Sequence, residues 1–384
     1  MRAVPAPPRL PVPSVFRGSD LLPQVEKALA GERLTFEDGV RLFTSDDVNA
    51  LGWAANAVRE RLHGNVAYYL KNRHINYTNV CRYDCMFCSF YRKEGEEGAW
   101  LWSVDQVLEH VAPYKNKGLK EFHIVGGVHP TLPFAYYTDM LRALKREHPD
   151  VAIKAFTAIE IAYLAELTGK PLRDVLTELK AAGLDMVPGG GAEVFADRVR
   201  YKVCRDKADA DRWFEVHETA HALGLPTNAT MLYGHIETAE ERVDHILRLR
   251  DLQDRTGGLK SYIPLAYHPD FNRLAKLGAP SGLDALRNVA AGRLLLDNVP
   301  HIKAYWIMLG VKVAQLALAW GANDIDGTVT WERIYHMAGA ETPEGLTEER
   351  LREVIREAGR EPVERDAFYN PVGTESEGAR GNRP

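Results

Sequence analysis

The chain of 384 residues is long enough to bury one large α/β domain or two ordinary domains. Its 45% apolar residues, 26% charged residues and formal net charge of -5 are typical of a globular protein, without the basic excess of a nucleic-acid binder. The proline-rich first residues lack the apolar core of a signal peptide, and no later stretch reaches the ~20 apolar residues of a membrane span. We therefore expect a cytoplasmic protein that neither binds nucleic acid nor inserts into a membrane.

The two ends of the chain are predicted to be disordered, because residues 1–18 are rich in proline and residues 371–384 are polar. Between residues 19 and 70 the apolar positions recur at helical spacing, and the helical stretches end at glycines suited to a helix C-terminus. This segment is predicted to be a helical N-terminal extension. Residues 331–370 are predicted to form a helical C-terminal extension.

Between residues 71 and 330, short apolar runs alternate with helical segments. The runs are HINYTN, EFHIVGG, VAIKAFTA, LDMVPGGG, TNATMLYG, SYIPLAY, HIKAYWIMLG and, more weakly, GANDIDG. This alternation predicts parallel strands joined by helical crossovers, and eight such units fit a single (β/α)8 barrel with its active site at the carboxyl ends of the strands. A doubly wound open sheet is the alternative, but no G-x-G-x-x-G motif follows the first run.

Two of the intervening helices begin with a recognisable capping box. Ser103 is followed three residues later by Gln106, and Thr238 by Glu241, each at the start of an apolar-periodic segment. The second of these helices is expected to end at Gly257.

Three of the four cysteines, Cys81, Cys85 and Cys88, lie in the loop after the first run with a C-x3-C-x2-C spacing. Clustered thiols in a chain so poor in cysteine favour metal binding or redox chemistry over a disulfide framework. Three thiolates can bind three corners of a 4Fe-4S cube and leave one iron without a protein ligand. A zinc site is the alternative, and it would need a fourth ligand such as His74 or Cys204.

This loop, with Phe87 just before its last cysteine, resembles the cysteine motif of the radical S-adenosylmethionine (radical SAM) enzymes. The resemblance implies that Cys81, Cys85 and Cys88 hold one 4Fe-4S cluster and that S-adenosylmethionine binds the open iron. It also implies a radical SAM (β/α)8 barrel and an electron donor such as flavodoxin or ferredoxin. Reduction then cleaves S-adenosylmethionine to a 5'-deoxyadenosyl radical.

Three further strand-end segments are similar to parts of the cofactor site in that superfamily. Gly126 and Gly127 match a segment whose backbone meets the methionine amino group, and Glu193 in PGGGAE matches a polar contact. Leu232 and Tyr233 belong to a segment near the adenine, although threonine and leucine stand where its motif has glycine and isoleucine. Taken singly, a glycine pair also suits an ordinary turn, and a glutamate suits a solvated surface.

A longer set of segments, from about residue 35 to 370, resembles the aminofutalosine synthase family of the futalosine route to menaquinone. These segments are NYTNVCRYDCMFCSFYRK, HIVGGVHP, IKAFTAIEI, MVPGGGAEVF, NATMLYGHIET, HIKAYWIMLG, GANDIDGT and PVERDAFYN. The implied reaction joins 3-[(1-carboxyvinyl)oxy]benzoate to the adenosyl group, giving 6-amino-6-deoxyfutalosine, methionine and bicarbonate. The alternative is dehypoxanthine futalosine cyclase or a related radical SAM enzyme, such as the deazaflavin-forming synthase; IKAFTAIEI and HIKAYWIMLG favour the aminofutalosine synthase.

The implied substrate carries two carboxylates, which need cationic or strong donor groups when they are buried. Four candidates at strand ends or beside them are His129, Lys154, Arg293 and Lys303. Each could instead form a structural salt bridge or lie in solvent. Two classes outside this family remain open: a zinc-stabilised binding module, and a cluster protein that only transfers electrons.

Overall fold

The computed structural model describes residues 11–373, in which every strand-to-strand ladder is parallel. The strands are β1 (Val66–Leu70), β2 (Asn72–Ile75), β3 (Glu121–Ile124), β4 (Ala152–Ala155), β5 (Thr227–Tyr233), β6 (Leu259–Ala266), β7 (His301–Ile302), β8 (Asp324–Gly327) and β9 (Glu361–Glu364). The α-helices are α1 (Leu22–Ala30), α2 (Phe36–Thr44), α3 (Val48–His63), α4 (Val104–Val111), α5 (Phe134–Glu147), α6 (Ala158–Thr168), α7 (Leu172–Ala182), α8 (Asp197–Cys204), α9 (Ala210–Ala222), α10 (Ala239–Thr256), α11 (Gly282–Leu295), α12 (Trp306–Leu309), α13 (Val311–Ala317) and α14 (Glu348–Glu357). Short 3-10 helices are η1 (Ser14–Phe16), η2 (Ala112–Tyr114), η3 (Ala275–Leu277) and η4 (His336–Ala338).

The strands follow one another around a ring. Three sheets, ordered β2-β3-β4, β5-β6-β7 and β8-β1-β9, make up its parts. Isolated parallel bridges join the sheets by pairing Lys154 with Met186, Val187 with Thr227, Lys303 with Asp324, and Arg73 with Thr330. The bridges insert residues 186–187 between β4 and β5 and return the ring to β2, so all eight predicted units take part in the barrel.

The fourth unit is the shortest of the eight, and its sequence gives the reason. Residues 186–187 pair on both sides, but Pro188 follows at once and has no N–H to continue a ladder. The unit therefore contributes only two bridged residues to the ring.

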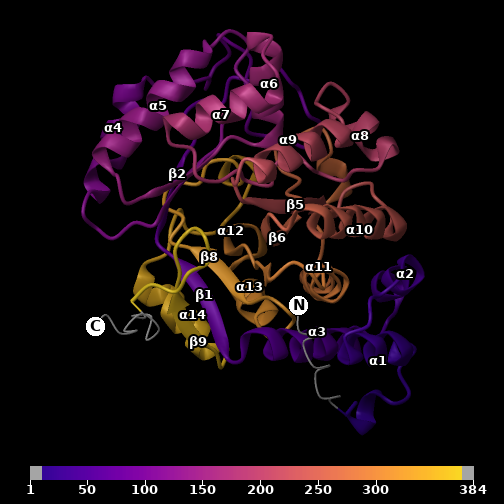
Figure 1. Cartoon of the computed structure of the whole chain (residues 1–384). Helices are drawn as coiled ribbons and strands as arrows, with labels where there is room; N and C mark the ends of the chain where they lie inside the picture. The colour runs from indigo at the N-terminus through magenta and orange to yellow at the C-terminus, as the bar shows by residue number, and fades with distance from the viewer. Residues whose placement is uncertain (1–10, 374–384) are drawn as a thin grey trace, which may run out of the picture.

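The N-terminal extension consists of α1, α2 and α3, followed by β1, and packs against α10 and α11 (Figure 1). The predicted disorder of residues 1–18 is wrong for the part that the structure describes. Residues Ser14–Phe16 form η1, and the ring of Phe16 lies 5.6 Å from that of Trp53. Residues 1–10 lie outside the described part of the chain.

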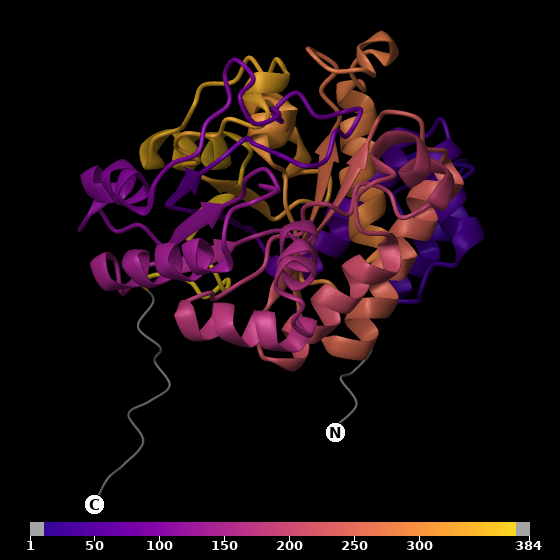
Figure 2. The ribbon, with the colours of Figure 1, turned by 90° about the horizontal axis from the view of Figure 1, so that it is seen from above.

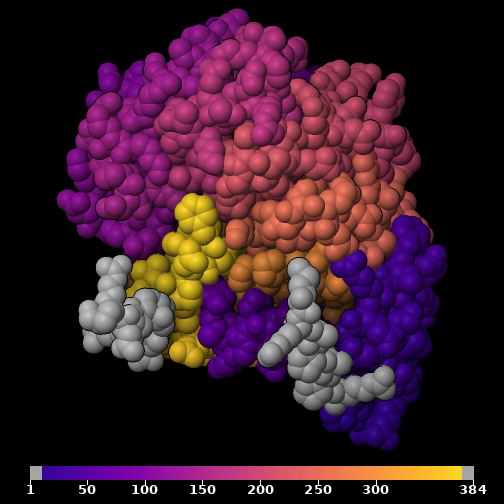
Figure 3. Space-filling view, in the orientation of Figure 1, coloured from indigo at the N-terminus to yellow at the C-terminus, as the bar shows by residue number. Residues whose placement is uncertain are grey.

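The C-terminal extension is only partly helical, contrary to the sequence prediction. After α14 the chain forms β9, which pairs in parallel with β1, so the first and last strands lie side by side (Figure 3). Before α14, residues 331–345 contribute Glu332, Ile334 and Tyr335 to a cavity at the mouth of the barrel. Of the predicted tail, residues 371–373 are described, and Val372 N–H donates to the carbonyl of Glu364 at 2.8 Å; residues 374–384 are not.

The two predicted capping boxes are confirmed. The Ser103 hydroxyl accepts from the Gln106 N–H at 3.2 Å and opens α4, and Thr238 pairs in the same way with Glu241 and opens α10, which ends at Gly257. The long loops after β2, β6 and β8 gather on one side of the barrel (Figure 2). Because parallel strands share one direction, this side carries their carboxyl ends. No helix in residues 11–373 has both the length and the apolar character that a membrane crossing requires.

Candidate active site

The loop after β2 carries Cys81, Cys85 and Cys88, all three partly buried, and all four cysteines of the chain are free thiols. The loop after β3 and helix α8 hold this segment in place. Val128 N–H donates to the Cys81 sulfur at 3.4 Å, and Met86 N–H donates to the carbonyl of Val203 at 2.8 Å. The three thiols are thus presented by a loop that is fixed on both of its sides.

Burial raises the pKa of all three loop thiols, most strongly that of Cys85. The ammonium of Lys207 acts on each of them in the opposite direction, because a nearby positive charge favours the thiolate. Lys207 and Cys85 line one surface cavity of about 300 Å³, and Cys204 at the end of α8 lines it too. A cation therefore stands beside the thiols that would have to ionise to bind iron.

The donor set fits a cluster better than a single ion. Within residues 11–373, no three His, Cys, Asp or Glu side chains converge on the position of one metal ion, as a zinc site would require. His74, a possible fourth zinc ligand, instead stacks on His123 with ring centroids 4.6 Å apart. Three thiols spaced along one loop suit the separate corners of an iron-sulfur cube.

Gly126 and Gly127 pack the loop after β3 directly against the cysteine loop. A Cβ on Gly127 would lie 2.3 Å from the carbonyl oxygen of Val80, and a Cβ on Gly126 would lie 2.7 Å from the Tyr77 ring. Gly127 N–H also donates to the carbonyl of Thr78 at 2.8 Å. The sequence argument explained these glycines by the approach of a cofactor, and the structure adds contact between two loops as a reason.

Glu193 lies in the loop between Val187 and α8, and its backbone has a positive φ of 47°. Its buried carboxylate forms an ion pair with Lys207, and its carbonyl accepts from Leu232 N–H at 2.9 Å. Although burial alone would lower the pKa of Lys207, Glu193 raises it above its usual value. Lys207 also stands 5.5 Å from the Phe87 ring centre. Phe87, Glu193 and Lys207 thus form one cluster beside the cysteine loop.

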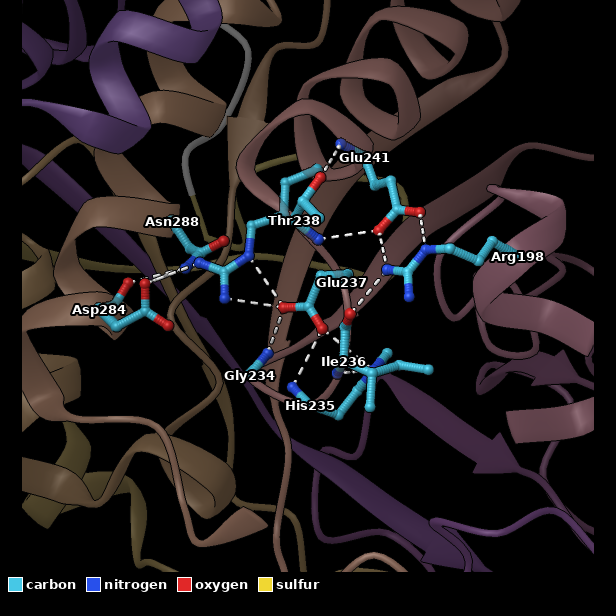
Figure 4. Close-up of polar contacts among 10 residues, drawn as sticks. Arg198, Gly234, His235, Ile236, Glu237, Thr238, Glu241, Asp284 and Asn288 are labelled. Carbon is cyan, nitrogen blue, oxygen red and sulfur yellow. Dashed lines mark hydrogen bonds and ion pairs between the residues drawn. The ribbon is translucent and has the colours of Figure 1, made fainter. Parts of the chain in front are cut away.

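The turn after β5 is held by a buried carboxylate. Glu237 accepts from the backbone N–H groups of Gly234 at 2.6 Å and His235 at 3.0 Å (Figure 4). Arg242 of α10 bridges Glu237 and Asp284 of α11, each at 2.7 Å. This network fixes the chain direction just beyond Leu232 and Tyr233, whose segment the resemblance places near the adenine.

Strand alternation separates Leu232 from Tyr233. Asn228 and Thr230, which line the barrel cavity, share their face of β5 with Leu232. Tyr233 faces the helical layer instead, where the guanidinium of Arg242 lies 5.5 Å from its ring centre. At the end of β5, only the backbone of Tyr233 is therefore available to contact a ligand in the barrel mouth.

A cavity of about 130 Å³ opens at the mouth of the barrel, and Lys154 and Lys303 both line it. Lys154 pairs with Glu121 at 2.7 Å, and Lys303 pairs with Asp326 at 3.0 Å. Burial lowers the pKa of Lys154, whereas Asp326 raises that of Lys303 in spite of burial. The structure thus brings two of the four predicted carboxylate-binding candidates together.

The other two candidates lie elsewhere. Arg293 of α11 is buried and donates to the carbonyls of Gly321 at 2.9 Å and Pro300 at 3.1 Å, at the amino ends of β8 and β7. That is the opposite end of the barrel from the cavity, so Arg293 serves the fold rather than a substrate there. His129 is buried in the loop after β3, where its Nδ1 accepts from Thr131 N–H at 3.3 Å, and it does not line the cavity.

Lys207 and Asn228 are among the polar residues of the site that sequence reasoning missed. Lys207 sits in a polar turn with no motif or periodicity to single it out, and only folding brings it to Glu193. Asn228 is buried and lines the cavity, and its side-chain oxygen has no hydrogen-bond partner in the described residues. The amide of Asn228 within a predicted buried strand, TNATMLYG, is the signal that could have found it.

Comparison with known proteins agrees with this geometry. Two family models match the chain: the radical SAM superfamily over residues 75–249 and the CofH/MqnC C-terminal region over residues 256–377. In the solved structure of methylornithine synthase, the matching fold covers 88% of this chain and 97% of that one, with a TM-score of 0.71 at 16% sequence identity. The chain belongs to the radical SAM superfamily, and membership implies a 4Fe-4S cluster and S-adenosylmethionine.

Closer relatives define the family within that superfamily. Aminodeoxyfutalosine synthase of Thermus thermophilus is 54% identical over 361 residues, which cover 93% of this chain and 97% of the relative. Cyclic dehypoxanthine futalosine synthase of Streptomyces coelicolor is 36% identical, covering 91% of this chain and 88% of the relative. The chain belongs to the aminodeoxyfutalosine synthase family, for which aminofutalosine synthase is a shorter name.

Proposed function

We propose that this chain catalyses the aminodeoxyfutalosine synthase reaction. In it, the 5'-deoxyadenosyl radical adds to the enol ether of 3-[(1-carboxyvinyl)oxy]benzoate, and the adduct rearranges onto the ring and loses bicarbonate. The products are 6-amino-6-deoxyfutalosine and methionine, so S-adenosylmethionine is consumed as a co-substrate. The observation that carries the proposal is 54% identity to a synthase over nearly the full length of both chains.

Cys81, Cys85 and Cys88 would hold one 4Fe-4S cluster, which, when bound and reduced by a donor such as flavodoxin or ferredoxin, supplies the electron that cleaves S-adenosylmethionine. The loop of Gly126 and Gly127 would meet the methionine end of S-adenosylmethionine. Other residues assigned to the same co-substrate are Phe87, Glu193, Leu232 and the backbone of Tyr233. Their support is their position around the cysteine loop and the end of β5.

Lys154 and Lys303 would bind the two carboxylates of the benzoate substrate. Both line the cavity, and each ammonium has three donors, so each can bond a substrate carboxylate while keeping its carboxylate partner. Asn228 would supply a neutral polar contact, because it lines the same cavity and its side-chain oxygen is buried without a partner in the described residues. Free thiols and an oxygen-sensitive cluster suit a reducing compartment, so we place the protein in the cytoplasm.

The fate of the adenosyl group tests the proposal. Reduced, cluster-loaded protein is given the enol-ether benzoate and adenosine-labelled S-adenosylmethionine, and the products are identified by mass spectrometry. We expect the label in aminodeoxyfutalosine, with methionine in matching amount and free 5'-deoxyadenosine only as a side product. Label confined to 5'-deoxyadenosine, or turnover only with dehypoxanthine futalosine, would reject the synthase and favour the cyclase.

The readings outside the family predict different results. A zinc-stabilised binding module would be colourless and hold one zinc per chain. A cluster protein that only transfers electrons would leave S-adenosylmethionine intact after reduction.

A further inference from the structure

Glu160, in the first turn of α6, is a buried carboxylate on which three strand-end segments converge. Its Oε2 accepts from the Thr157 N–H at 2.7 Å and the Thr157 hydroxyl at 2.9 Å, completing a capping box at the end of β4. Its Oε1 accepts from the Tyr77 hydroxyl at 2.9 Å and from the Gly126 N–H at 3.3 Å. One carboxylate thus binds the cysteine loop, the loop after β3 and the start of α6.

The contacts of Glu160 lead directly to the thiols. Gly126 is followed by Gly127, whose N–H donates to the carbonyl of Thr78, and by Val128, whose N–H donates to the Cys81 sulfur. Neither glycine has room for a Cβ against the cysteine loop, so the two segments are in direct backbone contact. A displacement of Gly126 would therefore shift the loop assigned to the methionine end of S-adenosylmethionine.

On its other side Glu160 reaches the substrate cavity. Thr157, which donates both of its hydrogen bonds to Glu160, lines the cavity together with Lys154 of β4. Between them Phe156 has a positive φ of 61°, a conformation that L residues adopt only where the surroundings enforce it. The carboxylate thus connects the side that would generate the radical with the side that would hold the acceptor.

We propose that Glu160 is a positioning residue that sets the distance and orientation between S-adenosylmethionine and the substrate cavity. This inference rests on the proposed function for its second readout, the partition of the radical between product and 5'-deoxyadenosine. Radical addition needs the reacting carbons at near-attack separation, and small displacements lower the yield of such steps steeply. Loosening the three segments should therefore weaken cofactor binding and divert the radical.

The test compares Glu160→Gln with Glu166→Gln. Glutamine keeps the shape of the side chain but replaces one carboxylate oxygen with an NH2 group. This group cannot accept the two hydrogen bonds that the replaced oxygen accepted. Glu166 is a matched control, because it lies on the same helix and also contacts the cysteine loop, through an exposed ion pair with Arg82 at 2.9 Å. Three quantities are measured: iron and sulfide per chain, the melting temperature of cluster-free protein, and the Kd of S-adenosylmethionine for oxidised, cluster-loaded protein without turnover.

We expect Glu160→Gln to raise this Kd by about tenfold, the equivalent of one to two hydrogen bonds, while Glu166→Gln stays near wild type. In turnover, Glu160→Gln should release more free 5'-deoxyadenosine per aminodeoxyfutalosine. Equal Kd and equal partition in the two variants would overturn the proposal.

If Glu160→Gln fails to bind the iron-sulfur cluster, its Kd for S-adenosylmethionine cannot be interpreted. The variant Tyr77→Phe then tests the same contact. It removes one donor to Glu160 and leaves the buried ring in place. A raised Kd in Tyr77→Phe supports the positioning role, whereas an unchanged Kd shows that Glu160 only stabilises the fold. If wild-type protein made no aminodeoxyfutalosine, the proposed function would fail, and the Kd comparison would still decide the role of Glu160.

Discussion

The buried ion pair of Glu193 and Lys207 lies beside the cysteine loop, and each of its two charges depends on the other. Both side chains are about 10% exposed, and their partners include the Phe87 ring and the Leu232 backbone. A buried charge that loses its partner is expensive, even where the intact pair adds little net stability.

Lys207→Met should therefore destabilise the cluster-free protein by about 3 kcal/mol, because it leaves the Glu193 carboxylate buried without a counter-charge. Urea unfolding measures the loss. Lys202→Met, an exposed lysine on α8, is the control and should change stability by less than about 0.5 kcal/mol. Equal effects of the two substitutions would show that the pair is not a buried unit in solution.

The cysteines make the most direct prediction at this scale. Alanine at Cys81, Cys85 or Cys88 should each abolish the cluster, because the loop offers no spare thiol. Cys204→Ala should keep it, although Cys204 lines the same cavity as Cys85. Iron and sulfide per chain, with the absorption spectrum, measure the outcome. A loop cysteine that proved dispensable while Cys204 did not would refute the three-ligand assignment.

His336 gives the protein a pH-dependent contact beside the cavity. Hydrogen bonding to the Glu332 carboxylate raises the pKa of His336 from 6.5 to about 9. A raised pKa in the folded state adds stability that is fully present below pH 6.5 and is lost as the pH rises through 9. The melting temperature of His336→Gln should thus lie furthest below wild type near pH 6 and converge with it by about pH 10. A constant difference across this range would exclude the charged pair.

At the scale of elements, the site depends on two loops that fit without a gap. The loop after β3 crosses the cysteine loop so closely that residue 127 has no space for a side chain. The glycine is thus part of the scaffold of the thiols as well as of the surface offered to a co-substrate.

Gly127→Ala should consequently lower the iron content of the protein, because its Cβ would push Val80 and the adjoining Cys81 away. Gly282→Ala on α11 is the control, since its nearest neighbour would be Val313 at an ordinary 3.4 Å. Iron analysis after identical anaerobic reconstitution compares the two. Full cluster content in Gly127→Ala would mean that the loops can separate and that the glycine serves the co-substrate alone.

Elements were predictable where local signals are strong. The capping boxes at Ser103 and Thr238 predict the starts of their helices, because both hydrogen bonds of a capping box join residues within one helical turn. β9 was missed because Glu361–Glu364 is a polar edge strand that only its pairing with β1 stabilises. The placement of Arg293 was wrong although the sequence held the answer: Arg293 precedes the HIKAYWIMLG run, so it lies at the amino end of β7, whereas the site lies at the carboxyl ends of the strands.

At the scale of the whole molecule, the last strand, β9, pairs with an edge of the first strand, β1. β9 covers the edge of β1, and the Arg365 guanidinium that follows it pairs with the buried Asp324 of β8 at 2.5 Å. Removing this segment would expose a strand edge and leave a buried carboxylate without its partner.

A chain ending at Ala358 should accordingly be found mainly in the insoluble fraction, whereas a chain ending at Gly373 should match the full-length protein. Soluble yield and the urea midpoint of both truncations provide the measurement. A soluble and equally stable chain ending at Ala358 would show that β9 is dispensable.

The closure of the ring also sets an order of events during synthesis. β2 pairs with β3, which follows it closely in the chain, on one edge. On its other edge it contacts residues 328–330, and the hydrogen bond between Asn72 and Val329 spans 257 residues of chain. Contacts of such long sequence separation form late in folding. The strand that precedes the cysteine loop is therefore paired on one edge only until nearly the whole chain has been synthesised.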